Sequence, residues 1–86
     1  MLKISELAVE HAVTLKLEGR LIGPWVEALR DVCENRLQDG RRWQLDCTDV
    51  SYADRAGVFL LLKLQAHGVE LMNCSSFLAE ELKARP

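Results

Sequence analysis

Residues 45–57 read Leu-Asp-Cys-Thr-Asp-Val-Ser-Tyr-Ala-Asp-Arg-Ala-Gly, and the largely apolar run 58–64 follows them. This order of residue types predicts a strand that ends here, a polar loop and then a helix. Asp54 stands where a helix N-cap is expected, because a carboxylate there accepts the first unpaired N–H groups and favours the positive end of the helix dipole. Ala56 and Gly57 keep the first helical turn small.

The helix expected over residues 56–67 is too apolar for an ordinary surface helix. One face carries Gly57, Leu60, Leu61 and Leu64. The opposite face carries Val58, Phe59, Leu62 and Ala66, rimmed by Arg55, Lys63 and Gln65. Such a helix is either buried on both sides or half buried with a face left for a partner. In a chain of 86 residues with one helical layer, little remains to cover a second face, so we favour a partner.

The composition predicts one soluble globular domain over residues 1–86. Hydrophobic residues make up 49% of the chain and charged residues 28%. The formal net charge of -2 argues against general nucleic-acid binding. The run 58–62 is too short to cross a membrane, and the N-terminus lacks a secretory signal. Cys33, Cys47 and Cys74 are an odd number without metal-ligand spacing, so we expect free, mostly buried thiols in a reducing compartment.

The N-terminal residues predict two strands joined by a tight turn. Leu2 and Ile4, followed by Leu7 and Val9, indicate a first strand with a change of phase and a bulge near residues 5–6. Alternation over residues 13–18 is typical of a half-buried second strand, which the glycine-containing segment 19–23 interrupts.

Pro24 suits the first position of an amphipathic helix, and Gly40 suits its C-cap. The apolar stripe of this helix is Trp25, Val26, Leu29, Val32, Cys33 and Leu37, and its polar face is Glu27, Arg30, Asp31, Glu34 and Gln38.

Residues 43–47 alternate again and predict a third strand, and residues 69–73 predict a fourth. Ser75 or Ser76 is expected to cap a last helix, with Phe77, Leu78 and Leu82 pointing inward.

The resulting order is β-β-α-β-α-β-α. A βαβ crossover makes neighbouring strands parallel and places its helix on the sheet. Three strands carry a polar residue at every second position, so one face of the sheet should stay open to water or a partner. The expected fold class is therefore α/β, with a single four-stranded mixed sheet and helices on one face.

Four short motifs recur in one known family. Residues 17–21, Leu-Glu-Gly-Arg-Leu, are similar to its L-x-G-x-L, and residues 45–54 are similar to D-L-S-x-V-x-x-x-D. Gly57 and the apolar run after it look like the end of D-S-x-G-x-x-x-L, and residues 68–71 look like G-x-x-L. The chain thus resembles the STAS domain, found in anti-sigma-factor antagonists and at the C-terminus of sulfate transporters.

Two departures from the family pattern bear on function. In the antagonists a kinase phosphorylates the serine of D-S-x-G, and Arg55 occupies that position here. A guanidinium does not accept the phosphoryl group, and its charge is permanently positive. The chain also stops after the third helix, where many members continue, so the resemblance implies a short form.

Each of the polar residues in the range 46–55 has more than one interpretation. Asp46, Asp49 and Asp54 suggest a metal or phosphate site, but we favour a strand-end turn and a cap, with no metal. Arg55 could bind an anion at the helix start, pair with an acid or contact a partner. Thr48 or Ser51 could replace the missing phosphorylated serine, although loop hydrogen bonding is the preferred reading.

No set of acid, base and nucleophile can be assembled, which argues against an enzyme. We regard His11 and His67 as surface or turn residues and expect no cofactor.

We therefore predict a non-enzymatic interaction module in the cytoplasm of a bacterium, without the usual serine switch. The residues expected to bind the partner are Asp49, Ser51, Asp54, Arg55, Val58, Phe59, Leu62 and Lys63. By resemblance the partner is an anti-sigma factor or a kinase-like ATPase, and a homodimer is a further option. Two alternatives remain open: an accessory STAS-type subunit of a lipid-trafficking ABC transporter, and a small-ligand or nucleotide binder that uses Arg55.

Overall fold

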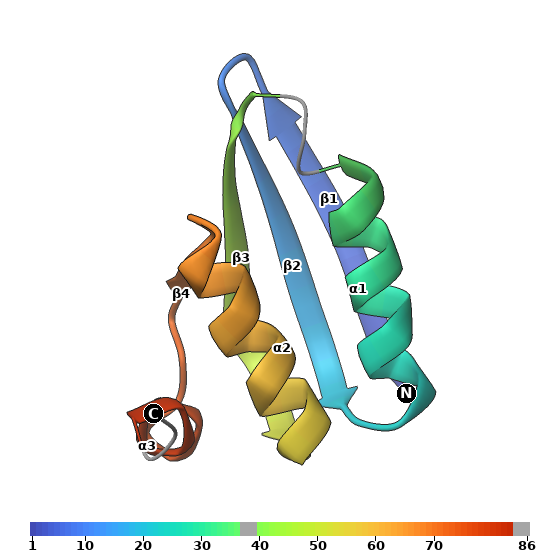
Figure 1. Ribbon diagram of the computed structural model, residues 1–86, viewed down its shortest axis with the longest axis vertical. Coiled ribbons are helices and arrows are strands. Elements are labelled where there is room, and N and C mark those ends of the chain that lie inside the picture. Colours follow the sequence, from blue (N-terminus) through green and yellow to red (C-terminus); the bar gives the residue numbers. More distant parts are fainter. Residues whose placement is uncertain (37–39, 84–86) are drawn as a thin grey trace.

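The predicted order of strands and helices is confirmed by the structure, a computed structural model that describes residues 1–36 and 40–83 (Figure 1). The elements are β1 (Leu2–Val9), β2 (Ala12–Leu21), α1 (Pro24–Arg36), β3 (Arg42–Ala53), α2 (Arg55–Ala66), β4 (Glu70–Met72) and α3 (Ser76–Lys83). Among the described residues, no helix combines the length and the apolar character that crossing a bilayer requires.

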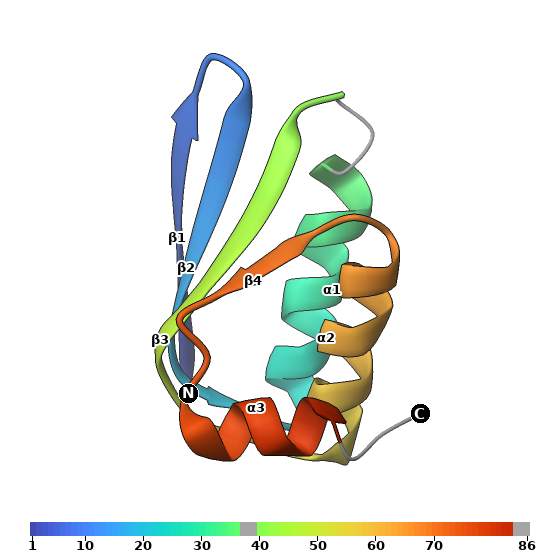
Figure 2. The ribbon, with the colours of Figure 1, turned by 90° about the vertical axis from the view of Figure 1, so that its left-hand side faces the viewer.

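The four strands form one mixed sheet in the order β1-β2-β3-β4. β1 and β2 are antiparallel, whereas β2 pairs with β3 and β3 pairs with β4 in parallel. Figure 2 shows α1 and α2 side by side on one face of this sheet, with α3 at the end where β3 finishes. The other face of the sheet carries no helix among the described residues, as the alternation of polar residues predicted.

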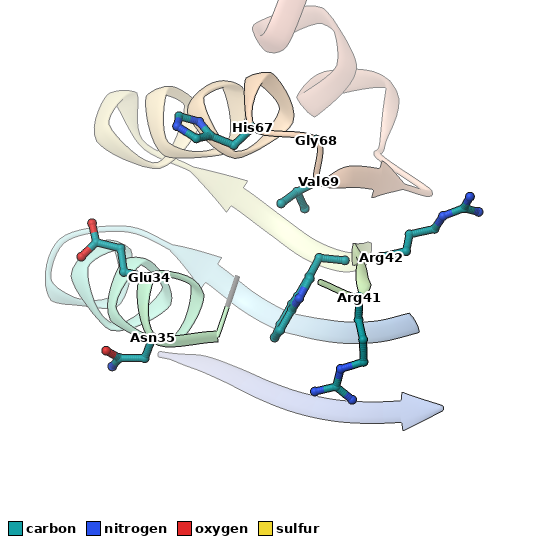
Figure 3. A pocket seen from close by; sticks show the side chains of 8 residues that line it. Glu34, Asn35, Arg41, Arg42, His67, Gly68 and Val69 are labelled. Carbon is teal, nitrogen blue, oxygen red and sulfur yellow. The ribbon is translucent and has the colours of Figure 1, made fainter. Parts of the chain in front are cut away.

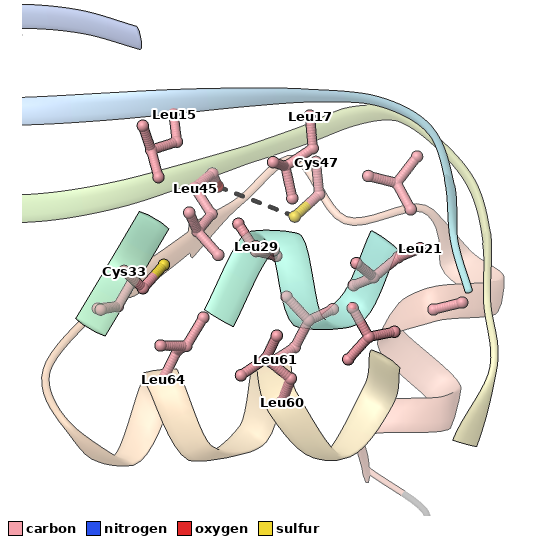
Figure 4. Packing of buried hydrophobic residues seen from close by; sticks show 14 of the residues in the cluster. Leu15, Leu17, Leu21, Leu29, Cys33, Leu45, Cys47, Leu60, Leu61 and Leu64 are labelled. Atoms are coloured by element: carbon pink, nitrogen blue, oxygen red, sulfur yellow. Dashed lines mark hydrogen bonds between the residues drawn. The ribbon is translucent and has the colours of Figure 1, made fainter. Parts of the chain in front are cut away.

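The core lies between the sheet and the two long helices. Every second residue of β2 points into it, namely Val13, Leu15 and Leu17, because side chains alternate along a strand. Leucines of α1 and α2 meet these strand residues from the other side (Figure 4). No polar or charged side chain of the described residues is buried. The fold is therefore held mainly by apolar burial in one layer between helices and sheet.

The predicted bulge in the first strand is wrong. The register between β1 and β2 runs without interruption from the pair Leu2 and Gly19 to the pair Val9 and Ala12. Leu7 and Val9 break the expected phase because they point to the open face of the sheet, opposite to Leu2. Leu7 is 67% exposed, so the apolar residues of this strand belong to two different faces.

The predicted polar loop after residue 47 is also wrong, because β3 continues to Ala53. β2 likewise runs on to Leu21, and the two strands stay paired through two register shifts, between Lys16 and Glu18 and between Gly19 and Arg20. The shifts change the spacing of buried residues in β3 from two to three, at Cys47, Val50 and Ala53. Only Asp54 separates the end of this strand from α2.

The helix that begins at Pro24 is confirmed as α1. The residues predicted to continue its two faces, Leu37 and Gln38, lie outside the described residues. Gly40 follows that gap with a φ of 79°, the left-handed region that favours glycine. The cap predicted there stays a prediction.

The C-terminal elements differ from expectation at their ends. β4 is shorter than the predicted strand over residues 69–73. Ser75 is the residue that caps α3, because its Oγ accepts the N–H of Leu78 at 3.1 Å. Leu78 is buried as predicted, but Phe77 is 49% exposed. Its ring stacks on Tyr52 instead of entering the core.

Candidate protein-docking surface

Asp54 fixes the start of α2 as the predicted N-cap. Its Oδ1 accepts the N–H of Gly57 at 2.8 Å, and its Oδ2 accepts the N–H of Gly23 at 3.0 Å. One carboxylate therefore satisfies the first turn of α2 and ties it to the turn that precedes α1. Both oxygens are engaged in the fold, so Asp54 sets the orientation of the start of α2.

Gly57 brings the same turn against the end of β2. A Cβ placed on Gly57 would lie 2.5 Å from the carbonyl oxygen of Leu21 and 3.0 Å from its Cγ. That oxygen also accepts the N–H of Asp54 at 3.1 Å. The small residue is thus required by a close approach between helix and strand, which fixes the direction in which α2 leaves the sheet.

Arg55, Phe59 and Lys63 form an exposed stripe along α2, which we call the α2 stripe. The spacing of four residues places these three side chains on one face of the helix. Phe59 is 51% exposed, and the two cations on either side of it are also exposed. Arg55 forms no ion pair or side-chain hydrogen bond with another described residue. The stripe presents an aromatic ring between two positive charges.

The predicted docking face of α2 is narrower than expected. Val58 is 1% exposed and belongs to the core, which contradicts its place on a partner face. Leu62 is half-buried and packs against the core cluster. The reason is that α2 contacts α1 and α3 as well as the sheet, so neighbours cover more than one side of it. Phe59 and Lys63 are the members of the predicted set that remain exposed on this helix, with Arg55 at its start.

Asp49 and Ser51 lie away from the α2 stripe. Asp49 pairs with Lys16 at 3.5 Å on the sheet face opposite the helices, where both side chains are about half exposed. The hydroxyl of Ser51 donates to the carbonyl oxygen of Gly19 at 3.2 Å. These residues hold β3 to β2, in agreement with the loop-bonding reading of Ser51.

Asp46 has a separate set of partners on β3, where it is paired with Lys16 of β2 and Met72 of β4. It accepts the N–H of Thr48 at 3.0 Å and also binds the Thr48 hydroxyl, and the Asn73 amide lies 3.4 Å away. The hydrogen bonds from Thr48, followed by those from Asn73 and the charge of Lys16, hold the pKa of Asp46 below its ordinary value. The three carboxylates therefore have three different roles. Within the described ranges, no three side chains of metal-ligating type come together.

An aromatic pair at the end of β3 was not expected from the sequence. The rings of Tyr52 and Phe77 stack with centroids 6.1 Å apart and planes 23° from each other. The pair lies at the same end of the sheet as the start of α2 (Figures 1 and 2). The sequence held one signal for the exposure of Phe77. Phe77 and Leu78 are adjacent in a helix, so they point in different directions, and the core cannot bury both side chains equally.

A hollow of about 680 Å³ opens at the opposite end of the two long helices (Figure 3). The described residues that line it are Glu34, Asn35, Arg41, Arg42, Trp43, His67, Gly68 and Val69. They include no hydroxyl or thiol that could act as a nucleophile. The imidazole Nδ1 of His67 lies 2.9 Å from the carbonyl oxygen of Lys63, which agrees with a role at the helix end. His11 is exposed in the turn after β1.

The comparison with protein families decides the family of this chain. The model described as "Mlab, STAS domain" matches residues 5–81. The chain belongs to the STAS domain family. No curated protein sequence matches it significantly.

Two solved structures have the fold of this STAS domain. One is the anti-sigma factor antagonist SpoIIAA in its unphosphorylated form, with a TM-score of 0.73 and 22% identity over 98% of this chain and 84% of that one. The other is an uncharacterized protein of the DUF3478 family from Shewanella loihica, described as SpoIIAA-like in fold. Its TM-score is 0.60 and its identity 15%, over 88% of this chain and 69% of that one. At these identities the likeness establishes the fold.

Proposed function

We propose that this STAS domain is a non-enzymatic regulatory module that binds a protein partner through the α2 stripe, and that the partner is an anti-sigma factor or a related kinase-like ATPase. The observation that supports the proposal is Arg55. It occupies the position that the family resemblance gives to the phosphorylated serine, and it begins an exposed helix face with Phe59 one turn further on. The proposal also places the protein in the cytoplasm of a bacterium.

The α2 stripe has the chemistry of a binding hot spot. Aromatic residues and arginine are enriched at protein interfaces, and truncation of a residue that acts as a hot spot costs about 2 kcal/mol or more of binding free energy. The cap at Asp54 and the contact at Gly57 hold the start of the helix in place, so little ordering is needed on binding.

The positive charge of Arg55 also indicates how binding is controlled. Phosphorylation of a serine would place negative charge at the start of α2, whereas Arg55 keeps the charge positive under all conditions. Binding through this site is then constitutive, and control lies with the partner. The complementary surface on the partner is acidic around an apolar pocket that receives Phe59.

A second copy of this chain is a poorer occupant of the stripe. If two copies paired about a two-fold axis at Phe59, Arg55 of one helix would face Lys63 of the second copy. Juxtaposed like charges oppose such an interface. A different, acidic partner fits better than a homodimer.

Family membership leaves the identity of the partner open. The matching family model carries the name Mlab and not that of an antagonist. An accessory role beside the ATPase of a lipid-trafficking ABC transporter is therefore the second candidate. Both candidates bind an ATPase, and binding measurements against each type separate them.

The test uses the purified full chain and the kinase-type anti-sigma factors and ABC ATPases of its own host, with affinities measured by calorimetry. The variant Arg55→Glu/Phe59→Ser reverses the charge at residue 55 and removes the ring at residue 59. Phe77→Ser is the matched control, because Phe77 is as exposed as Phe59 but lies on α3. A double variant at Phe59 and Leu62 is less suitable, since Leu62 packs against the core.

We expect wild type and the Phe77→Ser control to bind one of the two ATPase types, and the stripe variant to bind at least about thirty-fold more weakly. Equal binding by all three proteins would place the interface elsewhere. Binding to the ABC ATPase alone would select the second candidate. If only a nucleotide binds, and its thermal stabilisation disappears in Arg55→Ala, the chain is instead a ligand-binding module.

A further inference from the structure

Two of the cysteines meet at the junction of β3, β4 and α3. The parallel register pairs Asp46 of β3 with Met72, the last residue of β4. Cys47 is one residue beyond this pair on β3, and Cys74 is two residues beyond it after β4. Asn73 has a φ of 59° and turns the chain there. Cys74 packs against the core cluster that contains Cys47, and its thiol is close enough to affect the pKa of the Cys47 thiol. All three cysteines of the chain are free thiols.

The two thiols differ in their access to solvent. Cys47 is fully buried in the core, where its Sγ also lies 3.9 Å from the carbonyl oxygen of Leu45 (Figure 4). Cys74 is half-buried. It lines a cavity of about 260 Å³ between α2, β4 and α3, together with Gln65, Leu71, Ala79, Leu82 and Lys83. A small oxidant can therefore reach the Cys74 thiol from solvent, whereas the Cys47 thiol stays buried in the core.

We propose that Cys47 and Cys74 are a redox-active pair that hydrogen peroxide converts reversibly into an intramolecular disulfide. The Cys74 thiolate attacks one oxygen of the peroxide, the O–O bond breaks, and the products are a sulfenic acid and hydroxide, which takes up the thiol proton as water. The Cys47 sulfur then attacks the sulfenic sulfur, the S–O bond breaks, and a second water leaves with the Cys47 proton. Two thiols and one peroxide give one disulfide and two waters.

The surroundings of the two thiols set the order of these steps. Burial, followed by the neighbouring Cys74, raises the pKa of the Cys47 thiol to about 12. Cys47 is thus a poor first nucleophile, and the accessible Cys74 reacts with the oxidant. Cys33 lies in α1, and burial raises the pKa of its thiol to about 11. It is only 1% exposed, so it should stay reduced.

The disulfide would connect β3 directly to the residue that precedes the cap of α3. Ser75, the next residue, accepts the N–H of Leu78, and Phe77 stacks on Tyr52. Oxidation therefore fastens α3 and its aromatic pair to the sheet at the end where α2 begins. The proposed disulfide is independent of the proposed docking function.

The test treats the purified full chain with an equimolar amount of hydrogen peroxide and follows it by intact mass, free-thiol assay and non-reducing peptide mapping. We expect the loss of two hydrogen atoms, a fall from three free thiols to one, and a peptide that links Cys47 to Cys74. Dithiothreitol should restore the starting mass.

The matched variants are Cys33→Ala, which should form the disulfide as wild type does, and Cys74→Ser, which should not. Circular dichroism checks that each variant is folded. Wild type that only gains oxygen at Cys74, forms dimers through Cys74, or keeps three free thiols would overturn the proposal. These results do not depend on any partner, so they stand or fall separately from the docking experiment.

Discussion

Replacement of Gly57 by alanine sets two effects against each other. In an ordinary helix interior the change stabilises a protein by about 0.8–1 kcal/mol, because alanine has the higher helix propensity. Here the added Cβ would lie 2.5 Å from the carbonyl oxygen of Leu21, closer than real Cβ atoms approach. The helix would have to move by about half an ångström, which strains the hydrogen bond from the Asp54 N–H to the Leu21 carbonyl oxygen.

Overpacking of this kind typically costs about 1–3 kcal/mol, and the obstacle is backbone rather than the mobile end of a side chain. We therefore expect Gly57→Ala to lower the free energy of unfolding by about 1–2 kcal/mol. For a domain of this size that corresponds to a fall in Tm of roughly 4–16 °C. Urea unfolding followed by circular dichroism measures the effect.

Ala66→Gly is the control for helix propensity, because Ala66 is exposed at the other end of the same helix. It should cost at most about 1 kcal/mol, because Ala66 is the last residue of the helix, and it has no steric contribution. If Gly57→Ala instead raised stability by the amount that Ala66→Gly lowers it, the close approach of α2 to β2 would be refuted.

Two further predictions concern carboxylates. Asp54→Ala removes the acceptor of both the Gly57 and the Gly23 N–H groups, so unfolding free energy should fall by about 2 kcal/mol, with a smaller loss for Asp54→Asn, which keeps one acceptor oxygen. A loss below about 0.5 kcal/mol for the alanine variant would show that the cap is not formed. The pKa of Asp46 is lowered on folding from its ordinary 3.8, so its contribution is present above that pH and disappears as the pH falls through the lowered value. The stability difference between wild type and Asp46→Asn should therefore shrink in acid titrations below about pH 4, and a difference that stays constant to pH 2 would contradict the assignment.

Local signals in the sequence were sufficient for much of the fold. The N-cap at Asp54 and the start of α1 at Pro24 depend on residues within one helical turn, so they are legible from the chain alone. The alternation of Val13, Leu15 and Leu17 placed the helices on one face of the sheet in the same way. The motifs around residues 45–57 also indicated the STAS family, to which the chain belongs.

Contacts between distant segments decided the rest. Pairing with β2 extends β3 to Ala53, although residues 48–52 look like a loop when read alone. The packing of α1 and α3 around α2 buries Val58 and leaves Phe59 exposed, a choice that a helical wheel cannot make because it does not show what surrounds the helix. The meeting of Cys47 with Cys74 depends on the register of β3 and β4. Caps and periodicity are properties of a few neighbouring residues, whereas register and the covered arc of a helix arise only when elements far apart in the chain come together.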